Sequence, residues 1–319
     1  MKRRRAKEEV AAASRILVVG IGGGGDVAGA LAAAEAARAL GVADAVVGGL
    51  TWERRPVDPL PGPRLLDEIE GLVERLGDGT SAAIAGPDTT GPGGFRFCEA
   101  DMSSFLDGAP VLLVDPNPGP RAIARGLDAA AERFAADLVL LLDVGGDVLA
   151  HGTEPGLASP LADATVLAAA LHMTTPTLGV VFGTGCDGEL TPAEVAERLD
   201  EVAAAGGAVG DLPLPDAAIA RTEASLAHVT TEASAMALRC ARGETGDVPI
   251  RQGRRTVPLT PAGGRLICFD PAIAIASAAR LAAAVAQAPS LEDAQQILTA
   301  LGVRTELDYE RDAAAQPAP

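Results

Sequence analysis

The chain is poor in aromatic and basic residues. Only 3% of its 319 residues are aromatic, and 26 Lys and Arg stand against 43 Asp and Glu, which gives a formal net charge of −17 at pH 7. Contact with a nucleic-acid backbone needs a basic surface, and base stacking needs exposed rings. The composition therefore predicts that nucleic acid is not a partner.

Long apolar runs are also missing. None reaches the roughly 18 residues of a membrane-spanning helix, although 48% of the residues are hydrophobic. The basic start of the sequence is not followed by the apolar segment of a signal peptide. We therefore expect a cytoplasmic protein without membrane contact, in which residues 1–14 and 307–319 are flexible tails.

Cysteine and histidine are scarce. The four cysteines are far apart and lack the C-x-x-C spacing of zinc sites, so neither a zinc site nor a disulfide framework is indicated. There is also no G-x-S-x-G or H-E-x-x-H motif and no suggestive Cys/His pair. These absences disfavour acyl transfer and zinc-dependent hydrolysis.

The most distinctive segment is RILVVGIGGGGDVAGA at residues 15–30, where an apolar run meets glycines and then an alanine-rich helical pattern. Glycine allows positive φ and close approach of a ligand, and a helix N-terminus attracts anions. We predict a phosphate- or cofactor-binding loop made of Gly20, Gly22, Gly23, Gly24 and Gly25. Close packing of strand against helix is the alternative.

The loop matches the dinucleotide fingerprint G-x-G-x-x-G at Gly20, Gly22 and Gly25. Asp26 at the helix entrance would repel a pyrophosphate unless a cation lay between them. A dinucleotide site also needs an acidic residue at the end of the next strand to bind the ribose. Glu53 is the only candidate there, and it lies farther from the glycine motif than is usual. NAD(P) is therefore an alternative cofactor and not the preferred one.

Apolar runs alternate with helical patterns along the chain. Continuous Val, Leu and Ile runs predict strands buried on both faces of a sheet at residues 16–20, 45–50, 111–115, 138–143, 178–182 and 266–269. Helices are predicted at residues 27–40, 120–134, 160–172, 192–205 and 271–287, with a last one after Ser290. This order predicts an α/β fold: a doubly wound, mostly parallel, Rossmann-like sheet of about six strands with helices on both faces.

Residues 15–306 are predicted to form a single α/β domain with insertions near 51–109 and 206–261. Within the first insertion we expect a helix at 64–76 and a mobile, lid-like segment at 78–94, which is rich in glycine and proline. Within the second we expect a helix around 232–242.

Acidic residues and glycines gather after the predicted strands, and ligands of such sheets bind at the carboxyl ends of the strands. The acidic residues at these ends are Asp26, Asp115, Asp143, Asp147, Glu154, Asp163, Asp187 and Glu189. Crowded carboxylates need a cation or a proton to relieve their repulsion, and Mg²⁺ is commonly held by carboxylates together with a substrate phosphate. We predict that Asp26, Asp147 and Asp187 hold the metal. Capping of helices and turns is the alternative role of these aspartates.

Further site residues are predicted around these ends. Asp147, Asp187 and His151 are the predicted catalytic residues, because histidine titrates near neutral pH and a carboxylate can act as a base. Gly145 and Gly146 are predicted to contact the cofactor. Trp52 and Arg54 are predicted to contact the substrate by stacking and by pairing with phosphate, although the tryptophan could equally fill a hydrophobic gap. Arg64, Arg251, Arg254 and Arg255 are additional phosphate-binding candidates.

The phrases GIGGGGDVAGA, DVGGDVLAHGTEPGLASPLADA and TTEASAMALRCARGE, together with GGLTWERRPVDPLPGPR and GCDGELTPAEV, resemble the uncharacterised domain-of-unknown-function family 1152 of archaea and actinobacteria. The similarity extends over about residues 15–306. The resemblance implies a Rossmann-like fold and a cytosolic prokaryotic protein, and it carries no established reaction.

The residues favour an enzyme that acts on a phosphorylated small molecule or nucleotide with the help of Mg²⁺, by phosphoryl transfer, hydrolysis or glycosidic cleavage. Two alternatives stay open. One is an NAD(P)- or flavin-dependent oxidoreductase, and the other is a nucleotide-binding sensor without catalysis. A homo-oligomer is compatible with any of the three.

Overall fold

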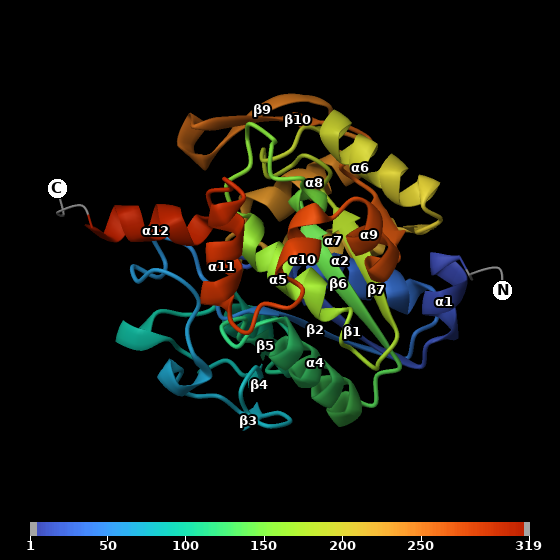
Figure 1. Cartoon of the computed structure of the whole chain (residues 1–319). Helices are drawn as coiled ribbons and strands as arrows, with labels where there is room; N and C mark the ends of the chain where they lie inside the picture. Colours follow the sequence, from blue (N-terminus) through green and yellow to red (C-terminus); the bar gives the residue numbers. More distant parts are fainter. Residues whose placement is uncertain (1–4, 316–319) are drawn as a thin grey trace.

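The computed structural model describes residues 5–315, and its centre is a nine-stranded sheet with the order β3-β4-β5-β2-β1-β6-β7-β11-β8 (Figure 1). Five neighbouring strands in the middle are parallel. They are β5 (Val111–Val114), β2 (Asp44–Leu50), β1 (Arg15–Gly20), β6 (Leu138–Val144) and β7 (Thr177–Phe182). The α/β class and the parallel core are therefore confirmed.

The direction of strand order reverses between β1 and β6. From β1 the chain continues to β2 and then β5 on one side, and α4 (Pro120–Phe134) returns it to β6 on the other side. In doubly wound sheets this reversal opens the ligand site at the carboxyl ends of the two strands. The ends of β1 and β6 are thus where the topology places a site.

Helices cover both faces of the sheet (Figure 1). Side chains alternate along β1, so that Leu17 and Val19 pack into one core while Ile16 and Val18 pack into the other. The first core includes residues of α4, α5 (Pro160–Ala169), α6 (Pro192–Ala204), α9 (Pro271–Ser277), α10 (Arg280–Val285) and α11 (Leu291–Ala300). The second includes residues of α2 (Asp26–Ala39), α7 (Asp216–Ser225) and α8 (Glu232–Ala241).

The sheet has three more strands than the sequence predicts. These are β3 (Glu74–Arg75), β4 (Ala82–Ala85) and β8 (Ala208–Leu212), and they are too short or too polar to stand out as apolar runs. β11 (Leu266–Phe269) lies at the predicted place but is antiparallel to β7. An apolar run of four residues indicates burial and carries no information about direction.

The first insertion differs from its prediction. Residues 64–76 do not form a helix. Only Leu66–Glu68 makes a short 3₁₀ turn, and Gly71 interrupts the segment with a φ of +71°. Within the predicted lid-like segment, residues 82–85 form β4, which pairs with β5 and is buried at all four residues. A short 3₁₀ turn, Pro92–Gly94, and the helix α3 (Cys98–Phe105) follow.

The second insertion contains the predicted helix as α8, together with a hairpin of β9 (Gly246–Ile250) and β10 (Arg255–Leu259). The 3₁₀ turn Arg251–Gly253 joins the two strands. The predicted helix at 271–287 is divided into α9 and α10, and no proline or glycine marks the division in the sequence.

The ends of the chain were expected to be flexible, but their described parts are helical. In α1 (Ala6–Ala12), Ala6 and Val10 are fully buried in the second core. In α12 (Glu306–Ala315), Glu306 and Glu310 are buried and bonded to distant parts of the chain. The sequences of these two short segments contain no pattern from which such long-range contacts could be predicted. Residues 1–4 and 316–319 lie outside the described residues.

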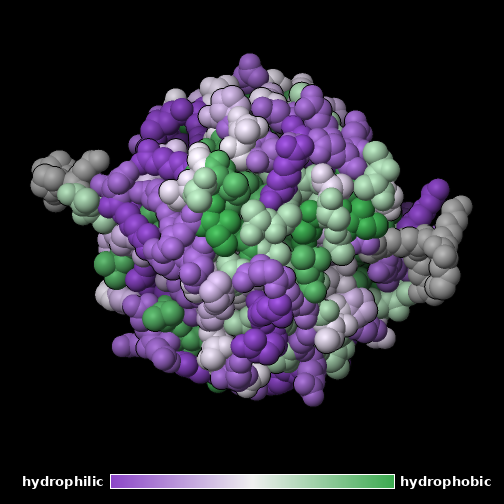
Figure 2. Space-filling model, viewed as in Figure 1, coloured by the Kyte–Doolittle hydropathy of each residue, from purple (hydrophilic) through white to green (hydrophobic). Residues whose placement is uncertain are grey.

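Hydrophilic side chains surround a scattered band of hydrophobic ones on the face shown in Figure 2. Within residues 5–315, no helix combines the length and the apolar character needed to cross a membrane.

Candidate functional site

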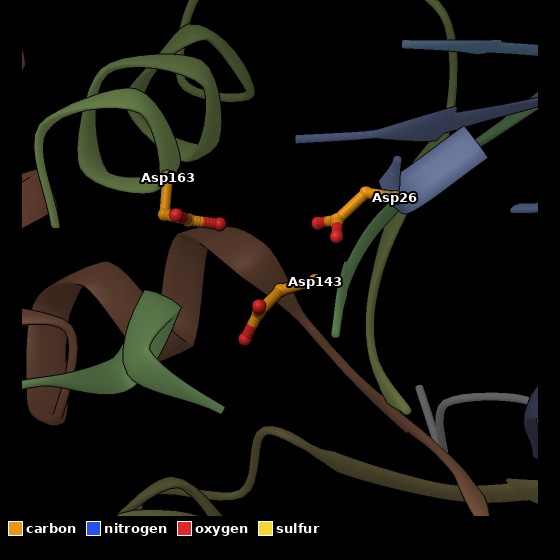
Figure 3. A group of neighbouring side chains, drawn as sticks. All are labelled: Asp26, Asp143 and Asp163. Carbon is orange, nitrogen blue, oxygen red and sulfur yellow. The ribbon is translucent and has the colours of Figure 1, made fainter. Parts of the chain in front are cut away.

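Three aspartates meet at the switch point between β1 and β6. Asp26 is the first residue of α2, Asp143 lies in β6, and Asp163 lies in the first turn of α5. All three are buried, and one carboxylate oxygen from each lies within 4.8 Å of the others. Figure 3 shows the carboxylates of Asp26 and Asp163 facing each other, with Asp143 nearby. We call these three residues the first acidic group.

Hydrogen bonds satisfy this group only in part. Asp26 Oδ2 accepts from the backbone N–H of Gly22 at 3.1 Å, and Asp143 Oδ2 accepts from that of Gly146 at 2.8 Å. Asp163 is 98% buried, yet its Oδ1 has no hydrogen-bond partner. A buried polar atom without a hydrogen-bond partner costs free energy.

A second acidic group lies beside the first. Asp147 follows β6, and Asp187 and Glu189 lie in the loop after β7; again one oxygen of each is within 4.8 Å of the others. Asp187 is 93% buried, and its Oδ1 has no hydrogen-bond partner. Glu189, in contrast, accepts from the backbone N–H groups of Ala158 and Ser159 at 2.7 and 2.8 Å.

The sequence predicts a single metal site from Asp26, Asp147 and Asp187. The structure instead divides these residues between the two groups. Asp143, Asp163 and Glu189 complete the groups, although the sequence prediction did not include them among the metal ligands. Asp163 was missed because an aspartate in a first helical turn ordinarily interacts with the helix dipole.

Burial raises the pKa of each aspartate in the two groups. It raises the pKa of Asp26 to about 7, although backbone N–H groups of Gly22 and Val144 act in the opposite direction. Burial and then the negative charge of Glu189 raise the pKa of Asp187 to about 7. Burial together with neighbouring carboxylates raises the pKa of the remaining three, Asp143, Asp147 and Asp163, well above the usual range. A bound cation would reverse these shifts.

Positive charge near the groups is limited. Among the described residues, none of the five aspartates has an ion pair within 4.0 Å; Glu189 lies 3.6 Å from Arg255 and 3.8 Å from Arg251. Arg54 is paired with Glu306 and Glu310, each at 3.4 Å, instead. Burial would lower the pKa of Arg54, but the two glutamates raise it, so this guanidinium stays charged.

Trp52 does not offer an exposed ring to a ligand. Its side chain is fully buried in the first core, its Nε1–H donates to both carboxylate oxygens of Glu310, and Arg54 stacks on the ring at 4.4 Å. The interpretation that it fills a hydrophobic gap is therefore the one that the structure supports. Glu53 is buried as well and accepts from the backbone N–H of Cys98 at 2.5 Å, so it is not directed at a ribose.

The glycine loop is packed tightly against other parts of the chain. A Cβ at Gly20 would lie 2.6 Å from the backbone of Asp26, and a Cβ at Gly23 would lie 2.9 Å from the carbonyl oxygen of Trp52. The N–H of Gly24 donates to that carbonyl at 3.0 Å. Gly25 has a φ of +110° and would meet Thr231. Close packing, the alternative interpretation, thus explains much of this motif.

His151 belongs to neither acidic group. Its Nδ1 lies 2.8 Å from a guanidinium nitrogen of Arg198, and its Nε2 lies 3.1 Å from the carboxylate of Glu201, both on α6. Burial and the charge of Arg198 lower the pKa of His151. The structure places this histidine with the charged residues of α6 and does not bring it to the predicted catalytic aspartates.

Two surface hollows, of about 450 and 490 Å³, lie away from the acidic groups. One is lined by residues of α11 and α12 and the segment between them, including Arg304 and Asp308. The other is lined by residues of α4 and by Thr174 and Thr175. No member of either acidic group lines these hollows.

The fold and the buried carboxylates define an α/β protein with a parallel core sheet and an acidic site at its switch point. The family model described as "Protein of unknown function (DUF1152)" matches residues 17–314, and the chain therefore belongs to this family. Comparison with curated proteins gave no match. Comparison with solved structures gave none either.

Proposed function

We propose that the protein is a Mg²⁺-dependent enzyme that acts on a phosphorylated small molecule or a nucleotide. The observation that carries this proposal is the set of five buried aspartates at the carboxyl edge of the sheet, none of them ion-paired within the described residues. Mg²⁺ prefers carboxylate oxygens and usually takes substrate phosphates as further ligands. A cation would also relieve the repulsion among these carboxylates.

Two arginines beside the second acidic group support a phosphorylated substrate. Arg251 and Arg255 come from the β9–β10 hairpin and lie near Glu189, and Arg255 also donates to the carbonyl oxygens of Asp187 and Gly156, each at 3.3 Å. Arginine binds phosphate oxygens through paired N–H donors. In a chain with a net charge of −17, these residues and the cation would supply the local positive charge that an anionic substrate needs.

The chain's own residues then have separate roles. Asp147 and Asp187 would hold the cation, and a carboxylate of this group that remains free of it could accept a proton from a nucleophile. Bound Mg²⁺ would polarise phosphate oxygens and stabilise the charge that develops on them. Phosphoryl transfer, hydrolysis and glycosidic cleavage are all compatible with this arrangement.

The two surface hollows do not include the carboxylates, and we propose that a movement of the chain opens the site to its substrate. The turn at Arg251–Gly253 is the segment that we expect to move. Arg251 and Gln252 both have positive φ there, at 51° and 59°, and both lie at the tip of a two-stranded hairpin outside the main sheet. Displacement of this turn would free Arg251 from Glu189.

The test is a search for products. Metal-free protein is incubated with a panel of nucleotides and sugar phosphates, with and without Mg²⁺, and the mixtures are examined by mass spectrometry. We expect turnover that depends on Mg²⁺ and that Asp147→Asn abolishes without a loss of melting temperature. The matched control is Asp115→Asn, a buried strand-end carboxylate that accepts from Asn117 and Leu66. Turnover that persists in Asp147→Asn would contradict the proposal.

A further inference from the structure

The two acidic groups share no residue. The oxygens of Asp26, Asp143 and Asp163 lie within 4.8 Å of one another, and so do those of the other set, Asp147, Asp187 and Glu189. Three oxygens at this mutual spacing can contact one ion, since cation–oxygen distances are about 2.0–2.6 Å. Each acidic group can therefore supply three of the oxygen ligands of a separate cation.

Each acidic group also contains a fully buried carboxylate oxygen that has no hydrogen-bond partner among the described residues. In the first set it is Oδ1 of Asp163, and in the second it is Oδ1 of Asp187; both side chains are more than nine-tenths buried. The absence of a hydrogen-bond partner is a separate observation from the short distances between the carboxylates, because closely spaced carboxylate oxygens can still accept hydrogen bonds from the protein. Buried oxygens without partners indicate a ligand.

Capping does not explain Asp163. The N–H groups at the start of α5 are already taken, since Leu161 and Ala162 donate to Glu306 at 2.9 Å and Ser159 donates to Glu189 at 2.8 Å. The carboxylate of Asp163 is thus not needed by its own helix.

A glycine faces each of the oxygens that lack a partner. A Cβ at Gly22 would lie 3.3 Å from Oδ1 of Asp163, and a Cβ at Gly145 would lie 2.7 Å from Oδ1 of Asp187. Both contacts are tighter than ordinary side-chain packing allows. A side chain at either position would therefore crowd the carboxylate, and glycine is what allows the backbone to lie this close to each oxygen.

We propose that the protein binds two divalent cations, one in each acidic group. The inference rests on the proposed function for its chemistry and narrows the substrate to a phosphate ester or anhydride whose oxygens contact both cations. The two groups adjoin each other along the chain, because Asp143 lies near the end of β6 and Asp147 begins the 3₁₀ turn Asp147–Leu149 that follows it. Paired cations are a common arrangement for displacement at phosphorus.

The test uses metal alone. Metal-free protein at pH 7.5 is titrated with Mn²⁺, which binds the same hard oxygen ligands as Mg²⁺, and the number of bound ions is measured by calorimetry. We expect two ions per chain in the wild type, one in Asp163→Asn, one in Asp187→Asn, and two in the control Asp115→Asn. Circular dichroism establishes that each variant is folded, and Asp143→Asn replaces Asp163→Asn if the latter is not.

One ion or none in the wild type would overturn the inference, and so would the loss of both ions in a single variant. The result is separate from the fate of the proposed function. Two bound ions without turnover of any phosphorylated compound would contradict the function and leave the two sites standing. Turnover with a single bound ion would support the proposed function and contradict the two cation sites.

Discussion

The substitution Asp26→Asn separates a ligand role of this aspartate from a capping role, because the two predict opposite changes in stability. The asparagine keeps the size of the side chain and an oxygen that can accept from Gly22, and it removes the charge. If the carboxylate is held ready for a cation, metal-free protein should become more stable when the charge is removed. If it is a cap, the protein should become less stable.

The magnitude follows from the pKa. Burial raises the pKa of Asp26 from 3.8 to about 7, which corresponds to about 4 kcal/mol because one pKa unit is worth about 1.36 kcal/mol. Between pH 3.8 and pH 7 the unfolded chain has lost this proton while the folded protein keeps it. The free energy of unfolding therefore falls as pH rises through this window and levels off above it.

Asp26→Asn should therefore raise the free energy of unfolding of the metal-free protein at pH 8 by about 2 to 4 kcal/mol, which is roughly 3 to 6 °C in melting temperature for a chain of this size. The gain should shrink as pH is lowered toward 4. Saturating Mg²⁺ should stabilise the wild type and erase the difference. Chemical denaturation at pH 5 and pH 8, with chelator or with Mg²⁺, measures all of these changes.

Asp128 is the matched control, since it accepts hydrogen bonds from Thr174 and Thr175 that hold its pKa below the usual value despite some burial. Asp128→Asn should lower the free energy of unfolding at pH 8, and Mg²⁺ should not change the effect. If Asp26→Asn behaves like this control, the carboxylate is a cap and the reasoning is refuted.

Three further predictions concern the surroundings of the acidic groups. Gly22→Ala should weaken Mn²⁺ binding in calorimetry, because the added Cβ would lie 2.8 Å from Oδ2 of Asp26. Unchanged binding would show that a side chain at residue 22 does not disturb the first acidic group. Arg251→Gln should lower the affinity for inorganic pyrophosphate in the presence of Mg²⁺. Arg254→Gln is the control and should leave this affinity unchanged, because among the described contacts Arg254 donates only to the backbone carbonyl of Arg251. Equal losses of affinity in the two variants would contradict a specific role of Arg251. Trp52→Phe should cost roughly 1 to 3 kcal/mol of stability, because it leaves the buried Glu310 without its indole donor, and the number of bound Mn²⁺ ions should stay the same.

The central fold could be predicted because its signals are local. The runs at residues 16–20, 45–50, 111–115, 138–143 and 178–182 are apolar throughout and alternate with helical patterns, and they became the five parallel strands. β4 and β8 could not be predicted in this way, because AAIA and AVGDL carry no marked strand pattern and are defined by pairing with distant strands.

The site was predictable only to the extent that parallel strands end at one edge. This rule brought attention to Asp26, Asp147 and Asp187, and it is why aspartates that are far apart in the sequence lie together. The rule could not show that they divide between two groups. The role of α12 was also hidden, because Glu310 and Trp52 are 258 residues apart and their bond depends on the whole fold.

A thermal-shift measurement on metal-free protein at pH 8 tests most directly whether the acidic groups bind Mg²⁺ and a phosphorylated ligand. It compares Mg²⁺ alone, phosphorylated compounds alone, and both together, across nucleotides, sugar phosphates, NAD(P) and inorganic phosphate. A ligand at 100 times its dissociation constant stabilises a protein by about 2.7 kcal/mol, which such a measurement detects. We expect a rise in melting temperature with Mg²⁺ and a larger rise when a phosphorylated compound is added with it. No change with Mg²⁺ at any concentration, or an NAD(P) shift that is independent of metal, would contradict it.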